Sequence, residues 1–307
     1  MMKTVSVKIG IAACMLLLLG LPGCGDTPKE DVAKTGPAPK GDEKSGQEAV
    51  RPQFTHKQFP TAAEALAEIV RDTKPRAIGF GEFHQQTKTA NILSALERFS
   101  SSMLPVLSGK TSDLIVETWV AQGACGAEEK KVLEQVDKVT ERPAETENET
   151  IRLLKRAKSL GIQPHILEVQ CEDYEKVQDP DGGLDYLALL ELVARRLKEK
   201  GKATLAYRAG KEEKIVALYG GAIHNDADPV EMWKTVSFAP DIKKAVGDQY
   251  VEVDIYVPEF IENSNLVSNE PWFPLFKKMT SPDKALLIKL DERSYIIGFP
   301  KGVSSPG

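Results

Sequence analysis

Residues 77–84 read AIGFGEFH, and residues 215–224 read IVALYGGAIH. Each stretch is an apolar run that reaches a glycine and ends in the pattern Gly-x-x-His. Apolar runs of this length, without polar alternation, are typical of buried parallel strands. The glycines at their ends allow a tight turn and the close approach of a ligand. Two strands that deliver a histidine in the same way therefore predict two halves of one site.

Strand and helix patterns alternate around these two stretches. Strand patterns cover residues 76–81, 113–118, 163–169, 214–221 and 250–257, and helical patterns cover 61–72, 87–104, 127–139, 149–160 and 184–200. Residues 285–290 and 294–299 flank a short polar turn and predict a hairpin. We expect an α/β fold with a mostly parallel sheet, helices on both faces and a C-terminal antiparallel hairpin.

The first 23 residues predict a lipoprotein signal peptide. Lys3 and Lys8 give a basic start, and Ile9–Leu19 is an apolar core too short to span a membrane comfortably. Residues 21–24 read LPGC, which resembles the lipobox of bacterial lipoproteins. The resemblance implies cleavage before Cys24 and lipidation of Cys24. An ordinary secretory signal and a chance cysteine are the alternatives.

Residues 24–52 have the composition of a tether. After Cys24 they are rich in Pro, Gly, Lys, Asp and Glu and contain no Leu, Ile or aromatic residue. Such a segment buries too little apolar surface to offset the entropy of ordering, so we expect a disordered linker. Residues 53–307 are then a single α/β domain. We expect an exported protein in the cell envelope, anchored to a membrane by lipid and facing the periplasm or the exterior.

Charge and cysteine content narrow the partners and the fold further. The formal net charge is −5 and no basic block occurs, so nucleic acid is not an expected partner. Cys125 and Cys171 remain in the mature chain, and both follow predicted strand ends. In an exported protein such a pair predicts a disulfide, with free buried thiols or metal ligation as alternatives.

The strand ends gather residues that suit catalysis. In an extended segment Glu82 and His84 point the same way, Glu117 closes a predicted strand, and Asp226 follows His224 by two residues. In open parallel sheets ligands bind beyond the carboxyl ends of the strands, where all of these fall. Two imidazoles with carboxylates suit a divalent metal, or acid–base work without metal.

These motifs resemble those of a known superfamily. Gly-Glu-x-His after an apolar strand, Glu117 ending the next strand and a late Gly-x-x-His resemble the erythromycin esterases, the Tiki/TraB proteins and the ChaN-like haem-binding lipoproteins. The resemblance implies that Glu82, His84 and His224 form the site, with Glu117 beside them. It also implies one of three activities, namely metal-dependent proteolysis, lactone opening or haem binding.

Three functional interpretations follow. The first is a hydrolase-like site with Glu82, His84, Glu117 and His224 as catalytic residues, acting on a small molecule or a peptide. A divalent metal held by His84, His224 and Glu82 would activate water, or His84 would act as the base without metal. The second is a haem- or iron-binding lipoprotein without turnover, with His84, His224 or Tyr219 as ligand. The third is a binding module that has lost its chemistry.

Overall fold

The computed structural model describes residues 54–211 and 213–302. The predicted signal peptide, Cys24 and the predicted tether lie outside these residues, so the structure leaves those expectations as predictions. Within the described ranges, no helix has both the length and the apolar character needed to cross a membrane.

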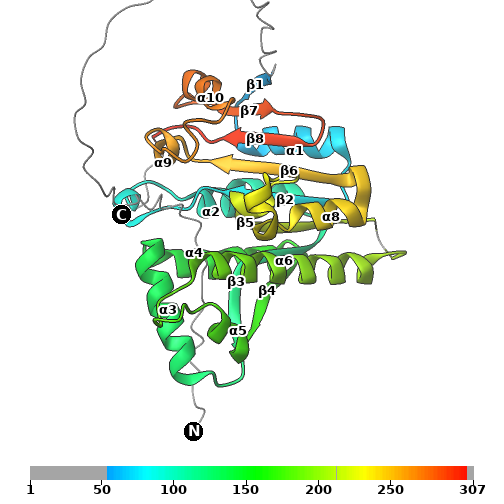
Figure 1. Ribbon diagram of the computed structural model, residues 1–307. Coiled ribbons are helices and arrows are strands. Elements are labelled where there is room, and N and C mark those ends of the chain that lie inside the picture. Colours follow the sequence, from blue (N-terminus) through cyan, green and yellow to red (C-terminus); the bar gives the residue numbers. More distant parts are fainter. Residues whose placement is uncertain (1–53, 212, 303–307) are drawn as a thin grey trace, which may run out of the picture. The chain divides into compact units, whose positions relative to one another are not determined.

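Eight strands form one sheet in the order β1-β7-β8-β6-β2-β5-β3-β4 (Figure 1). The strands are β1 (Thr55–Phe59), β2 (Ala77–Glu82), β3 (Thr111–Gln122), β4 (Gln163–Gln170), β5 (Ile215–Gly221), β6 (Tyr250–Tyr256), β7 (Ala285–Lys289) and β8 (Ser294–Gly298). Neighbouring strands from β8 to β4 are parallel, and β7 is antiparallel to both β8 and β1. The structure therefore confirms the predicted α/β fold with its C-terminal antiparallel hairpin.

Helices cover both faces of the sheet (Figure 1). The longer helices are α1 (Ala62–Thr73), α3 (Gly126–Thr140), α4 (Glu145–Ser159), α6 (Tyr186–Arg208), α8 (Ala239–Val246) and α10 (Phe273–Met279). The short ones are α2 (Ala95–Arg98), α5 (Cys171–Lys176), α7 (Ala222–Asn225) and α9 (Pro258–Ile261). One apolar cluster joins α1, α2 and α4 to alternate strand residues such as Ile78 and Phe80. The other joins α6 and α8 to the intervening residues, such as Ala77.

The segment 87–104 is not the single helix that its pattern predicts. It forms a 3₁₀ turn at Thr87–Thr89, then α2, a π-helical turn at Phe99–Met103 and a 3₁₀ turn at Leu104–Leu107. The Ser94 hydroxyl accepts the N–H of Glu97 at 2.9 Å and so starts a new helix inside the expected one. Apolar spacing alone does not show this interruption.

The sequence pattern leaves two other features open, namely where α6 ends and whether an edge strand precedes α1. The pattern of residues 203–210 suits either a helix or a strand, and the structure extends α6 through this segment as far as Arg208. The edge strand β1 has four of its five side chains exposed or half-buried, so it lacks the apolar run that marks the interior strands.

Candidate functional site

The two Gly-x-x-His stretches lie side by side. β2 and β5 pair in parallel, with Gly81 opposite Gly220 and Glu82 opposite Gly221. His84 follows the end of β2, and His224 lies on the short helix α7, which begins directly after β5. The strand pairing therefore brings both histidines to the carboxyl edge of the sheet, as the sequence predicts.

Glu82 orients His84. The Nδ1 atom of His84 lies 2.6 Å from Oε1 of Glu82, and the hydroxyl of Tyr219 donates to Oε2 of Glu82 at 2.6 Å. Both site residues are buried, with exposed fractions of 5% for Glu82 and 7% for His84. Burial raises the pKa of Glu82, but the charge and hydrogen bond of His84 outweigh it, and the net pKa is lowered. An ionised Glu82 holds the proton of His84 on Nδ1 and leaves Nε2 as the basic nitrogen.

Glu117 is a second carboxyl group of the site, and its pKa is raised where that of Glu82 is lowered. It lies across Gly220, where an added Cβ would come within 2.4 Å of its Oε2 atom, and Oε2 accepts the N–H of Gly221. Burial raises its pKa, while the charges of His84 and Arg142 and the Gly221 N–H oppose the rise only in part. Two carboxyl groups whose environments separate their pKa values are typical of an acid–base pair.

His224 is completely buried and is held by the backbone. Its Nδ1 atom donates to the carbonyl of Val236 at 2.5 Å, and its Nε2 atom lies 3.7 Å from Oε1 of Glu117. Burial lowers the pKa of His224 to about 4, although the bond to Val236 favours the charged form. His224 is therefore a neutral imidazole at neutral pH, with its Nε2 lone pair toward Glu117.

Three buried polar atoms of this cluster have no hydrogen-bond partner among the described residues. They are Nε2 of His84, Oε1 of Glu117 and Nε2 of His224. Buried polar atoms are nearly always paired, so three of them on adjacent side chains indicate a place for a ligand or a reacting water. The structure thus brings together the four predicted catalytic residues at one position.

The glycines of β2 make room for the side chains that hold α7. Asn225 donates from Nδ2 to the carbonyl of Gly79 at 3.0 Å, and the hydroxyl of Tyr250 donates to its Oδ1 at 2.5 Å. A Cβ at Gly79 would lie 1.7 Å from Oδ1 of Asn225, and a Cβ at Gly81 would lie 2.3 Å from Asp254. Only glycine fits at these positions. Asn225 therefore fixes α7, and with it His224, against the sheet.

Two further residues of the site were not found by sequence reasoning. Arg142, between α3 and α4, lowers the pKa of both site carboxyl groups by its charge. Glu149 on α4 accepts the Ser94 hydroxyl at 2.7 Å, and burial raises its pKa to about 7. In the sequence, Glu149 appears only as part of a predicted helix, and Arg142 belongs to no recognisable motif. Neither residue could therefore be assigned to the site from the sequence.

Asp226, Tyr219 and His165 have other hydrogen-bond partners than the two site histidines. Asp226 accepts the N–H of Asp228 at 2.9 Å and is not in contact with either histidine in the described structure. Tyr219 is bound to Glu82 and packs on Phe99, with ring centroids 4.7 Å apart. His165 lies 2.8 Å from Asp113 near the start of β4, which is the structural role of a satisfied histidine.

A disulfide joins Cys125 and Cys171, whose Cα atoms are 5.0 Å apart. Cys125 lies directly before α3, and Cys171 begins α5 at the end of β4. The bond therefore ties the connections that follow two adjacent strands, as the positions of the two cysteines predict.

The expected metal and haem ligands stay predictions, and the described residues give the following geometry. Within the described ranges, no group of three His, Cys, Asp or Glu side chains is placed to hold a metal ion. Glu82, one of the three expected ligands, has one oxygen on His84 and the other on Tyr219. The same hydrogen bond occupies the Tyr219 hydroxyl, the expected alternative haem ligand. We therefore derive no step through a metal or haem, and both remain predictions.

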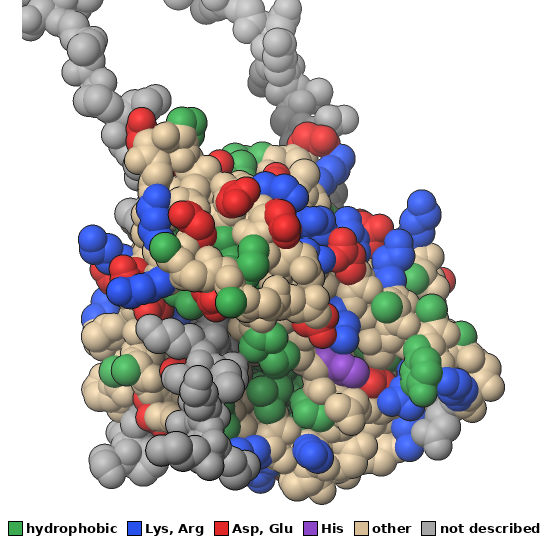
Figure 2. Space-filling view, turned by 90° about the horizontal axis from the view of Figure 1, so that it is seen from below, with side chains coloured by type: hydrophobic (Ala, Val, Ile, Leu, Met, Phe, Trp, Pro, Cys, Tyr) green, Lys and Arg blue, Asp and Glu red, His purple; other side chains and the backbone are tan. Residues whose placement is uncertain are grey.

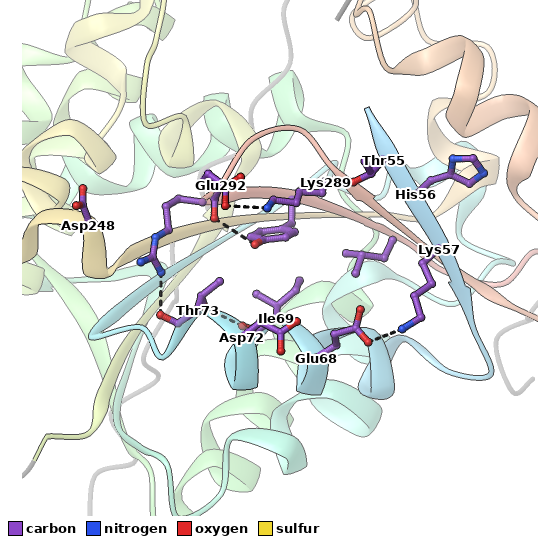
Figure 3. A pocket seen from close by; sticks show the side chains of 13 residues that line it. Thr55, His56, Lys57, Glu68, Ile69, Asp72, Thr73, Asp248, Lys289 and Glu292 are labelled. Atoms are coloured by element: carbon purple, nitrogen blue, oxygen red, sulfur yellow. Dashed lines mark hydrogen bonds and ion pairs between the residues drawn. The ribbon is translucent and has the colours of Figure 1, made fainter. Parts of the chain in front are cut away.

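A cavity of about 720 Å³ lies away from this site, between α1, β1 and the β7–β8 hairpin (Figure 3). Its charged side chains are largely paired with one another. Lys57 binds Glu68 at 2.6 Å, and Lys289 binds Glu292 at 2.9 Å. These two pairs neutralise four of the charged groups that line this cavity.

Acidic and basic side chains are interspersed on the face shown in Figure 2, which carries no continuous basic patch. Comparison of the chain with protein-family models, with curated proteins and with solved structures finds no match. The superfamily resemblance therefore stays a prediction that rests on the motifs.

Proposed function

We propose that this chain is a hydrolase that activates water by general-base catalysis at His84. The observation that carries the proposal is the buried Glu82–His84 pair, whose free Nε2 atom adjoins two further unpartnered atoms on Glu117 and His224. A base oriented by a carboxylate, next to a carboxyl group of raised pKa, is the arrangement that hydrolysis of an acyl group requires.

The residues divide the chemistry as follows. Nε2 of His84 takes a proton from water, and the water oxygen bonds to the acyl carbon of the substrate. The bond from that carbon to the leaving group breaks, and protonated Glu117 supplies the proton that the leaving group needs. His84 then releases its proton and Glu117 regains one, which restores the site. His224, neutral and 3.7 Å from Glu117, holds that carboxyl group in place.

The electrostatic environment supports these roles. Glu82 is the carboxyl group with the lowered pKa, so it stabilises the imidazolium that forms when His84 takes a proton. Glu117 is the one with the raised pKa, so it is the better proton donor of the two. If Glu82 were the acid and Glu117 oriented His84, the carboxyl group with the lowered pKa would have to donate a proton. The carboxyl group with the raised pKa would have to stabilise the imidazolium. Both assignments run against the direction of the pKa shifts.

We also propose that the enzyme is exported and anchored to a membrane through lipid on Cys24, since a basic start, a short apolar core and LPGC precede the described residues. Substitution of Cys24 by Ala should release the protein from the membrane fraction or leave it unprocessed. Unchanged processing and membrane partition in the variant would contradict the anchor.

The test of the hydrolase uses the full chain in detergent micelles with a panel of para-nitrophenyl esters, lactones and amides. We expect turnover by the wild type and loss of roughly a thousand-fold in kcat for His84→Ala, the range that general-base catalysis provides. The metal content of the active preparation, and its activity after dialysis against a chelator, would decide whether a metal takes part. No difference between the wild type and His84→Ala on any substrate would overturn the proposal.

A further inference from the structure

A second cavity of about 400 Å³ lies where α3 ends and α4 begins. Its wall has an exposed part and a buried part. The exposed part carries Lys130, Glu134, Asp137 and Glu147, and the buried part carries Thr140 and Thr146. Half-buried Arg142 lines the same cavity.

Arg142 belongs both to this cavity and to the site. Thr87, three residues after His84, donates from its N–H and from its hydroxyl to the carbonyl of Glu141, at 2.8 and 2.7 Å. These two bonds fix the α3–α4 connection to the loop that carries His84. The charge of Arg142 also lowers the pKa of both catalytic carboxyl groups. The cavity is therefore linked to the site through the bonded loop of Thr87 and through the charge of Arg142.

The buried part of the cavity offers donors for an anion. α4 begins at this point, and Ala144 in the N-cap position gives its first-turn amides no side-chain acceptor. An uncapped helix start attracts negative charge. The Thr146 hydroxyl in the first turn has no hydrogen-bond partner among the described residues, and Thr146 is only 7% exposed. A cation, a buried hydroxyl and a helix start thus converge on one small volume.

We propose that this cavity binds a carboxylate of the substrate, so that the enzyme acts on an ester or amide that carries a carboxylate near the bond to be broken. This inference rests on the proposed hydrolase function. Arg142 and Thr146 bind the carboxylate, and the bond to be broken lies at His84.

Binding is tested without turnover, with glutarate as the probe. Titration of the full chain with glutarate, followed by ligand-observed NMR, should show saturable binding to the wild type. We expect the dissociation constant to rise roughly ten-fold or more for Arg142→Gln and several-fold for Thr146→Val, since each loses a bond to a charged group. Lys130→Gln removes an equal charge from the exposed part of the wall and should change binding less than about two-fold.

Turnover is tested with two esters of similar length, the para-nitrophenyl monoester of glutarate and para-nitrophenyl hexanoate. The wild type should prefer the charged ester, and Arg142→Gln and Thr146→Val should reduce that preference through KM. If glutarate binds as expected but neither ester is hydrolysed, the hydrolase proposal fails and the carboxylate site stands. If glutarate binds no better to the wild type than to both variants, or does not bind, the carboxylate site is wrong, whatever the turnover.

Discussion

The ends of β2 and β5 carry the same pattern, yet they place their histidines in different environments. His84 faces a carboxylate at 2.6 Å, whereas His224 faces the carbonyl of Val236 at 2.5 Å. A carboxylate favours the charged imidazole, and complete burial disfavours it. The pKa of His224 accordingly falls to about 4. In the proposed mechanism the same motif therefore supplies a base at the end of β2 and a neutral positioning group after β5, because the two rings have different hydrogen-bond partners.

The largest expected effect is the difference in catalysis between the two histidines. His84→Gln should lower kcat by roughly a thousand-fold or more, because no other group of the site takes the proton from water. His224→Gln keeps a hydrogen-bonding amide beside Glu117 and should cost less, about ten- to a hundred-fold. Thermal unfolding of both variants serves as the control for folding. Equal losses of kcat would remove the proposed distinction between base and positioning group.

The second effect concerns stability in acid. His224 has a folded-state pKa of about 4, below the ordinary histidine value of 6.5, so the unfolded chain binds the extra proton first as the pH falls. The stability that neutral His224 provides is complete above pH 6.5 and is lost as the pH falls toward 4. Its size at most is about 3 kcal/mol. Urea unfolding of the wild type and of His224→Gln across this range should show a flatter acid limb in the variant.

A smaller effect is expected for the carboxylate that orients His84. Glu82→Gln removes the charge that stabilises the imidazolium but leaves a polar group in place, so kcat should fall by roughly ten- to a hundred-fold. Tyr219→Phe removes only the hydrogen bond to the other oxygen of Glu82 and should cost less than about ten-fold. A larger loss for Tyr219→Phe than for Glu82→Gln would assign the proton transfer to the tyrosine.

The smallest effects are expected for alanine substitutions at Gly220 and Gly79, two glycines whose space is filled by side chains of the site. A methyl group at Gly220 meets Glu117, whereas one at Gly79 meets Asn225, which anchors the helix of His224. Each alanine variant should lose about 1–3 kcal/mol of stability from overpacking. Gly220→Ala should in addition raise the pH at which Glu117 ceases to donate a proton, since it disturbs the Gly221 N–H bond. Identical pH profiles for the two variants would contradict this assignment.

Much of this arrangement follows from the sequence. The apolar runs ending at Gly81 and Gly221 predict parallel strands, and the parallel rule then places His84 and His224 at one edge. The two-residue spacing of Glu82 and His84 predicts their contact. The positions of Cys125 and Cys171 after neighbouring strands predict their bond.

The remainder depends on contacts that no local pattern encodes. Arg142 reaches the site because Thr87 binds the carbonyl of Glu141, a contact between segments 54 residues apart. Asp226 has the same sequence distance from His224 as Glu82 has from His84, but a turn bonds it to Asp228 instead. Residues two apart point the same way only in an extended segment. The chain is extended after β2, but α7 begins directly after β5, so Asp226 does not point with His224.

The strand order has a consequence for how the protein matures. β2 lies between β5 and β6, so the strand that carries Glu82 is completed only by segments that begin at Ile215 and Tyr250. No amino-terminal fragment that stops before these segments contains an assembled site. Pairings between such distant segments close late and slowly in folding. The site of such a chain can therefore assemble only after residues as late as Tyr250–Tyr256 have been synthesised.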